Sequence, residues 1–141
     1  MSELTPTNAT RLSWQGDHRF EAAGPQGAIA IASGADRQSL SPMEAMLSAV
    51  AGCMAVDVVD ILAKMRKTVR AYTVECEGWR RDELPRKFTR IRLTHRVSGP
   101  DVDSGSVARA VELSQTKYCS AMASLDPAIE VENVIAVEVL A

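Results

Sequence analysis

The sequence is poor in cysteine and histidine, with three Cys and two His in 141 residues. An odd number of cysteines does not form a disulfide framework, and a chain of this length buries one hydrophobic core without disulfides or a structural metal. The sequence contains neither a Cys-x-x-Cys motif nor a His–Cys cluster with ligand spacing. We therefore expect no metal site.

Targeting and membrane signals are also lacking. The opening Met1-Ser-Glu-Leu-Thr-Pro has no basic segment followed by an apolar one, so we expect no secretory signal and a cytoplasmic location. Residues 45–56 carry no charge, but such a stretch is shorter than the roughly 20 residues that cross a bilayer. We expect no membrane association. In the cytoplasm thiols stay reduced, so a redox-active cysteine there would cycle between its oxidised and reduced states and would not form a permanent disulfide.

The small net charge of −2 conceals a division along the chain. Eleven basic and four acidic residues lie between Lys64 and Arg96, a net charge of +7, and the rest of the chain carries −9. Because Tyr72, Trp79 and Phe88 are interleaved with the bases, this block could bind single-stranded nucleic acid. The alternative is a solvated sheet face beside an acidic surface. We favour the alternative and expect no nucleic-acid partner.

Three short β-strands are predicted at the N-terminus. Residues 10–15 alternate in polarity, Gly16-Asp17 interrupts them, and residues 19–22 resume the pattern, as in a β-hairpin. A turn at 24–27 precedes the short apolar run 28–32, which predicts a third strand. We expect an N-terminal β-meander.

A long helix is predicted to begin at Ser41. Ser41, Pro42 and Glu44 supply an N-cap, a proline at the first helical position and the acidic residue of a capping box. The pattern continues to about Lys67, and its uncharged part, 45–56, is rich in Ala, Ser and Gly. We therefore expect a central helix that is buried on nearly every side.

The rest of the chain alternates between strand and helix patterns. The predicted elements are strands at 70–76 and 90–97, a helix at 107–118, a break at Cys119-Ser120, a helix at 121–125 and a strand at 129–139. With no repeat and no long linker, the order predicts one α+β domain over residues 1–141, with further antiparallel strands and helices after the central helix.

The cysteines differ in their surroundings. Cys53 lies in the middle of the long helix, where it is either a compact core residue or a reactive thiolate. A thiolate there needs a cation from elsewhere, such as an arginine, because the helix dipole fades beyond the first turn and Asp57 opposes it. Cys119, at a helix break, is expected to be partly accessible. Cys76 is expected in the core.

The two histidines are not expected to act as catalytic bases. His18 falls at the turn of the predicted N-terminal hairpin, and His95 alternates with polar residues on an apolar strand face. We therefore place His18 on the surface and His95 in the core.

The segment Ser41-Pro-Met-Glu-Ala-Met-Leu-Ser-Ala-Val-Ala-Gly-Cys53, followed by Met-Ala-Val-Asp-Val-Val and later by Lys117-Tyr-Cys119-Ser, closely resembles the OsmC/Ohr family of thiol-dependent peroxide-reducing proteins. The resemblance covers essentially the whole chain, and Ser-Pro-Met-Glu looks like the YhfA-type branch. It implies an OsmC-like fold and an intertwined homodimer whose active sites form at the subunit interface.

The resemblance also implies a function without a prosthetic group. Cys53 would attack an organic hydroperoxide, or H2O2, and become a sulfenic acid. Cys119 would resolve the sulfenic acid as a disulfide, which a dithiol of the lipoyl type would reduce. This places the protein in oxidative or osmotic stress defence.

The activating residues follow the family less closely. In the organic-hydroperoxide branch an arginine pairs with a glutamate directly after the helix proline, but here that position is Met43 and Glu44 comes one residue later. Glu44 is a site candidate or a helix cap only, Arg19 is the first candidate arginine and Arg37 the second. Because Met43 stands at the position of the family's glutamate, a second interpretation stays open. In it the protein is a catalytically weak relative that binds or senses an acyl or electrophilic ligand at the dimer interface.

Overall fold

The computed structural model describes residues 4–140, which form a mixed α+β structure, so the predicted fold class is confirmed. Strands and helices follow one another in the predicted order. The elements are β1 (Arg11–Gly16), β2 (Arg19–Ala23), β3 (Ala28–Ala32), α1 (Pro42–Lys64), β4 (Ala71–Arg80), β5 (Phe88–Gly99), α2 (Ser104–Leu113), the π-helix η1 (Ser114–Tyr118), α3 (Ser120–Ala123) and β6 (Glu130–Val139).

The chain divides into two compact units, Met1–Met46 and Leu47–Ala141, with the division inside the second turn of α1. They are called the N-terminal unit and the C-terminal unit, and each is described by itself. The expectation of a single domain stays a prediction.

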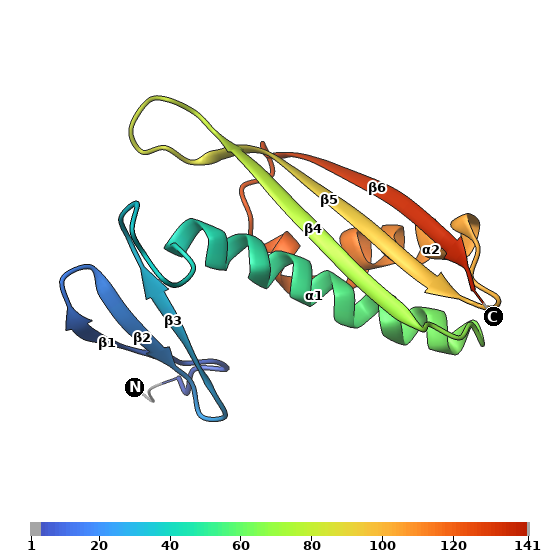
Figure 1. Ribbon diagram of the computed structural model, residues 1–141, viewed down its shortest axis with the longest axis horizontal. Helices are drawn as coiled ribbons and strands as arrows, with labels where there is room; N and C mark the ends of the chain where they lie inside the picture. The colour runs from blue at the N-terminus through green and yellow to red at the C-terminus, as the bar shows by residue number, and fades with distance from the viewer. Residues whose placement is uncertain (1–3, 141) are drawn as a thin grey trace. The chain divides into compact units, whose positions relative to one another are not determined.

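The N-terminal unit contains the predicted β-meander (Figure 1). Its sheet has the order β1-β2-β3, and both pairs are antiparallel. Gly16 and Asp17 have φ angles of 103° and 50°, which suit the tight hairpin between β1 and β2 because glycine and aspartate tolerate positive φ. The backbone N–H of Ala32 donates to the Leu40 carbonyl at 3.0 Å and brings the chain back before α1 begins.

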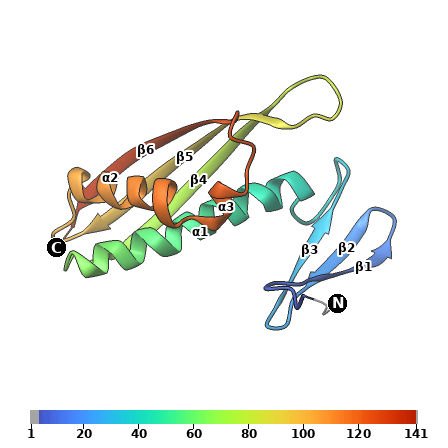
Figure 2. The ribbon, with the colours of Figure 1, turned by 180° about the vertical axis from the view of Figure 1, so that it is seen from behind.

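The C-terminal unit has a sheet of order β4-β5-β6 with α1 and α2 on the same side of it (Figure 2). Strands β4 and β5 are antiparallel, as expected, but β6 pairs parallel to β5. The expectation of antiparallel strands is therefore wrong for β6. The connection through α2, η1 and α3 is long enough to return the chain to the same end of the sheet, which a parallel pair requires.

One face of α1 builds the core of the C-terminal unit. Val50, Met54, Val58 and Leu62 recur every four residues and are at most 2% exposed, as one helix face dictates. They share this core with buried side chains of β5 and α2. These are Ile91, Leu93, Val97, Val107, Ala110 and Val111.

The expectation that α1 is buried on nearly every side is wrong for the single chain. Met46, Val56 and Val59 are 44%, 62% and 45% exposed, because the sheet and α2 cover only one face. By length and composition alone α1 could span a bilayer, with a mean hydropathy of 1.9 in its most apolar window, although the core helix of a soluble protein meets the same criterion. The absence of a membrane partner stays a prediction.

Helix α1 ends at Lys64, slightly before the expected Lys67. Arg66 adopts a left-handed conformation with φ of 62°, and the N–H of Lys67 donates to the Leu62 carbonyl at 2.9 Å. This is a Schellman ending, which satisfies carbonyl groups of the last turn.

Candidate active site at Cys53 and Cys119

The structure brings the two predicted redox cysteines together in the C-terminal unit. Cys53 lies on α1 and Cys119 lies between η1 and α3, 66 residues later. The thiol of Cys119 is close enough to Cys53 and Asp57 for both to raise its pKa. Both cysteines are free thiols, so the described state is the reduced one.

The backbone break at Cys119 places its side chain in the interior. Its φ and ψ of −74° and 104° end η1, and its N–H donates to the Ser114 carbonyl at 2.7 Å. Its sulfur accepts a hydrogen bond from the Met122 N–H at 3.3 Å. Because η1 ends at Tyr118 and α3 begins at Ser120, the predicted break at Cys119 is confirmed. The expected partial accessibility is wrong, since Cys119 is only 3% exposed. The buried side chain also caps α3.

The surroundings of Cys119 favour the neutral thiol. Burial raises its pKa most, and the hydrogen bond from Met122 lowers it. Cys53 and Asp57 add to the increase. Asp57, one helical turn after Cys53, accepts a 2.8 Å hydrogen bond from the fully buried Ser114 hydroxyl. A buried thiol beside a carboxylate holds its proton at neutral pH.

The other predicted site residues lie in the N-terminal unit. Arg37 Nη2 lies 2.9 Å from Glu44 Oε1, whereas Arg19 donates to the Gln15 carbonyl at 3.0 Å. Glu44 also forms the predicted capping box, because it accepts from the Ser41 N–H and its own N–H donates to the Ser41 hydroxyl. The Ser41 N–H and then Arg37 lower the pKa of Glu44. Arg37, the second candidate, is therefore the arginine that pairs with Glu44.

The third cysteine and the two histidines lie apart from this chemistry. Cys76 is half-buried on β4, and burial, with a smaller contribution from Glu77, raises the pKa of its thiol to about 11. His18 is exposed at the first hairpin, as expected. His95 is fully buried, as expected, but it is also hydrogen-bonded on both ring nitrogens, by Tyr72 and Asn133.

Sequence reasoning missed these hydrogen bonds. Strand alternation placed His95 in the core, but no local signal marked Tyr72 and Asn133 as its partners. Among residues 4–140 there is no group of three or more His, Cys, Asp or Glu side chains that could hold a metal ion.

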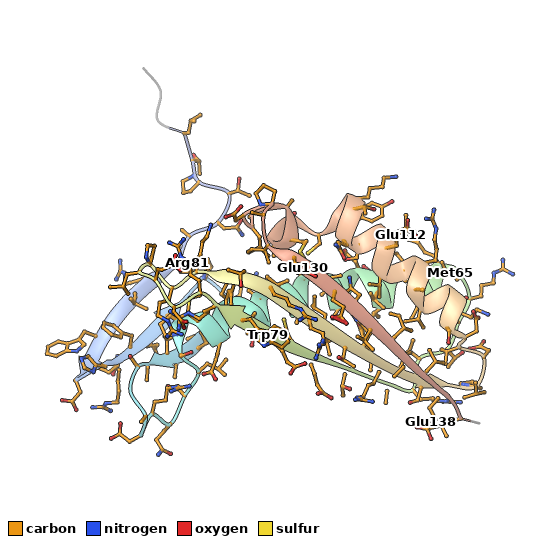
Figure 3. The ribbon with its side chains drawn as sticks, turned by 90° about the horizontal axis from the view of Figure 1, so that it is seen from above. Met65, Trp79, Arg81, Glu112, Glu130 and Glu138 are labelled. Atoms are coloured by element: carbon orange, nitrogen blue, oxygen red, sulfur yellow. The ribbon has the colours of Figure 1, made fainter. Side chains whose placement is uncertain are left out.

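The basic block lies largely on the sheet of the C-terminal unit, where its arginines pair with glutamates of neighbouring strands. Arg90 and Arg92 contact Glu132 at 2.7 and 3.3 Å. Their guanidinium groups also lie over Trp79, 4.9 and 5.1 Å from the ring centre. Figure 3 shows Trp79 on this sheet. Arginines with acidic partners on their own sheet favour the solvated-face interpretation over nucleic-acid binding.

Comparison with known proteins gives consistent matches. A family model described as "OsmC-like protein" matches residues 34–133. "Protein YhfA" of Escherichia coli (strain K12) is 46% identical over 93 residues, which cover 66% of this chain and 69% of that protein.

Solved structures share the fold. A hypothetical protein from Aquifex aeolicus VF5 aligns with a TM-score of 0.86 and 27% identity, over 95% of this chain and 98% of that one. An organic hydroperoxide resistance protein OsmC from Legionella pneumophila aligns with a TM-score of 0.70 and 10% identity, over 94% of this chain and 100% of that one. The second similarity, at so low an identity, concerns the fold alone.

Proposed function

Since this chain belongs to the OsmC-like family, we propose that it is a cytoplasmic cysteine-based peroxidase that reduces small organic hydroperoxides in stress defence. The observation that carries the proposal is the proximity of Cys53 and Cys119, two free thiols from distant parts of the sequence. We take the substrate class from the names of two proteins that share this fold, both called organic hydroperoxide resistance proteins.

The proposed reaction needs two cysteines and an external dithiol. The Cys53 thiolate attacks one peroxide oxygen, the O–O bond breaks, and the alkoxide takes a proton and leaves as the alcohol. Cys53 is now a sulfenic acid. Cys119 attacks its sulfur, the S–O bond breaks, and the Cys119 proton leaves with the hydroxide as water. A dithiol of the lipoyl type then reduces the disulfide and is itself oxidised.

The direction of the Cys119 pKa shift, raised mainly by burial, fits a resolving role. A thiol that is neutral at pH 7 reacts slowly with peroxide, because the thiolate is the nucleophile. Only after Cys53 is oxidised does Cys119 meet a strongly electrophilic sulfur. In the proposed reaction Cys53 therefore reacts with the peroxide, and Cys119 reacts only with the sulfenic acid of Cys53.

By the family resemblance, Arg37 and Glu44 are our candidates for the pair that activates Cys53. The resemblance calls for an arginine held by a glutamate at the start of the cysteine helix, and these two residues form such a pair at 2.9 Å. An arginine stays charged in any surroundings and so stabilises a thiolate. The arginine–glutamate pair therefore forms even though Glu44 comes one residue later than the family's glutamate, at whose position this chain has Met43.

The active form in this proposal is an intertwined homodimer. Apolar side chains along α1, among them Met46, Val56 and Val59, are 44–62% exposed in the single chain. Large exposed apolar side chains along one helix favour an interaction site. A second copy of α1 presents the same apolar side chains, and two-fold symmetry allows each copy to cover the other.

Asp57 and Met43 favour a second candidate function. Asp57 helps to raise the pKa of Cys119 and so opposes the thiolate form of that residue, and Met43 stands where the organic-hydroperoxide branch has glutamate. A chain with weak peroxidase chemistry would instead bind or sense an acyl or electrophilic small molecule at the dimer interface. Cys53 alkylation with a midpoint near the free-cysteine value of about 8.5 would favour this function, and one below about 7 would favour the peroxidase.

Peroxidase assays with dihydrolipoamide and with a monothiol test the proposal. We expect turnover with the dithiol, complete loss in Cys53→Ser, and loss of dithiol preference in Cys119→Ser. Cys76→Ser is the matched control and should retain turnover. Equal turnover of the parent and Cys53→Ser would contradict the proposal.

A further inference from the structure

The π-helix η1, which directly precedes Cys119, is attached to both of its neighbours by consecutive residues. The Ser114 hydroxyl donates to Asp57 Oδ2 on α1 at 2.8 Å. The side-chain carbonyl of Gln115 accepts a hydrogen bond from the Asn133 amide on β6. At its end, η1 is closed by the bond from the Cys119 N–H to the Ser114 carbonyl. The segment that carries Cys119 is thus tied to the cysteine helix and to the sheet.

The tie to the sheet continues as a relay of part-buried hydrogen bonds. The relay comprises Tyr72 on β4, His95 on β5, Asn133 on β6 and Gln115 on η1. The Tyr72 hydroxyl lies 2.8 Å from His95 Nδ1, and His95 Nε2 lies 3.0 Å from Asn133 Oδ1. All three strands of the sheet therefore contribute to holding η1.

Every bond in the relay has a defined direction. Because the Asn133 amide nitrogen donates to Gln115, its oxygen faces His95, and His95 Nε2 must carry the hydrogen. His95 Nδ1 then accepts from Tyr72. Neutral histidine fits this order, and the burial of His95, which is fully inaccessible, lowers its pKa in agreement.

Apolar side chains at the relay positions would pack without needing hydrogen-bond partners. Buried polar groups are costly when one partner is lost, but a fully paired set specifies a single arrangement because hydrogen bonds are directional. π-helical turns within helices are also frequent at functional sites. A directional relay that ends on a π-helix beside a reactive cysteine therefore suggests that the position of this turn matters.

We propose that the relay and the Ser114–Asp57 hydrogen bond hold η1 so that Cys119 remains against Cys53, and that they thereby set the rate of disulfide closure. The residues involved are positioning residues, since they act through η1. The inference rests on the proposed function for its redox pair. In the step concerned, the Cys119 sulfur attacks the Cys53 sulfur of the sulfenic acid, the S–O bond breaks, and water leaves with the Cys119 proton. Proximity governs the rate of such a step.

Two variants and a matched control test the proposal in a Cys76→Ser background. Asn133→Leu removes the centre of the relay, and Ser114→Ala removes the bond to Asp57. Thr116→Ala is the control, because Thr116 lies on the same π-helix and its hydroxyl donates to the Glu112 carbonyl of the adjoining α2. The measured quantities are the rate of decay of the Cys53 sulfenic acid after a pulse of cumene hydroperoxide and the Cys53–Cys119 disulfide equilibrium in dithiothreitol redox buffers.

We expect both variants to slow sulfenic-acid decay and lower the disulfide equilibrium constant by at least about tenfold, because misplacement of reacting groups by about 1 Å costs up to about 100-fold. The rate at which Cys53 reacts with hydroperoxide should stay within twofold, and Thr116→Ala should match the parent. If Asn133→Leu does not fold, Tyr72→Phe, which removes one hydroxyl at the far end of the relay, should shift both quantities in the same direction.

Folded variants with parental decay and equilibrium would overturn the proposal. The redox-buffer measurement needs no peroxide, so it separates this inference from the proposed function. If Cys53 does not react with hydroperoxide but the equilibrium constant falls as expected, the positioning role stands and the peroxidase assignment fails.

Discussion

Arg37 and Glu44 form an ion pair of 2.9 Å through the same carboxylate oxygen that accepts the Ser41 backbone N–H. The oxygen therefore caps α1 and holds the arginine at the same time. From the sequence, capping and a place in the active site look like alternative roles for Glu44. The structure makes the proposed active-site role compatible with capping, because the cap fixes the carboxylate in the orientation that Arg37 uses.

Replacing Arg37 should slow the first chemical step. We expect Arg37→Ala to lower the second-order rate of Cys53 oxidation by about 10-fold to 100-fold, the loss of one charge-assisted interaction of about 1.5–3 kcal/mol. Stopped-flow kinetics with cumene hydroperoxide measures this rate. Arg19→Ala is the matched control, since the Arg19 side chain donates to the Gln15 carbonyl and not to Glu44 among the described residues. A larger effect in Arg19→Ala would reverse the assignment.

Exposed α1 should not tolerate a charge if a second copy covers it. Val56 and Val139 are 62% and 66% exposed in the single chain, so Val56→Asp and Val139→Asp are equivalent changes for a monomer. In a homodimer packed through α1, Val56→Asp buries an unpaired carboxylate. Analytical ultracentrifugation should show a dissociated Val56→Asp protein and a dimeric Val139→Asp protein. The same mass for both variants would contradict the proposed interface.

The elements that follow local rules could be predicted from the sequence. The capping box at Ser41 marks the start of α1, and Cys119 falls at the predicted helix break. Alternation placed His95 in the interior, where it is fully buried. Each of these signals lies within a few residues of the feature that it predicts.

Features that depend on distant residues could not be predicted. The parallel pairing of β6 depends on the path of the chain through α2, η1 and α3. No local sequence pattern predicts that Gln115 accepts a hydrogen bond from Asn133, because 18 residues separate them. The choice of Arg37 over Arg19 required the position of the loop before α1, which has no periodic pattern.

The stability of the protein should fall between pH 7 and pH 5 because of His95. Burial lowers the pKa of His95 below the ordinary 6.5, so the unfolded state takes up a proton first as the pH falls. The contribution of neutral His95 to the free energy of unfolding is fully present above about pH 6.5 and declines below it. Carboxylates with lowered pKa, such as Glu132 and Asp126, lose their contributions only at more acidic pH, below 4.5 and 3.8.

Urea unfolding from pH 7.5 to 5 measures this effect as a decline in the free energy of unfolding. His18→Gln should show the same decline, because His18 is exposed. His95→Gln should be less stable at pH 7.5 and should lose this pH dependence. An unchanged slope in His95→Gln would show that another group is responsible.

The close approach of Gly99 to a neighbouring loop should make it intolerant of any side chain. A Cβ at this position would fall on the Thr68 carbonyl oxygen, which belongs to the backbone and cannot rotate away. We expect Gly99→Ala to destabilise the protein by about 1–3 kcal/mol, measured by urea unfolding. Gly27→Ala is the control, since the space around Gly27 is open, and equal stability of the two variants would contradict the close approach.

The most direct test of the central claim is the state of Cys53 after one equivalent of cumene hydroperoxide, read by mass spectrometry of peptides under denaturing, alkylating conditions. The account predicts a Cys53–Cys119 disulfide in the parent protein, a Cys53 sulfenic acid in Cys119→Ser, and Cys76 reduced in both. A Cys53 thiol that remains fully alkylatable in both proteins, or a disulfide that includes Cys76, would contradict it.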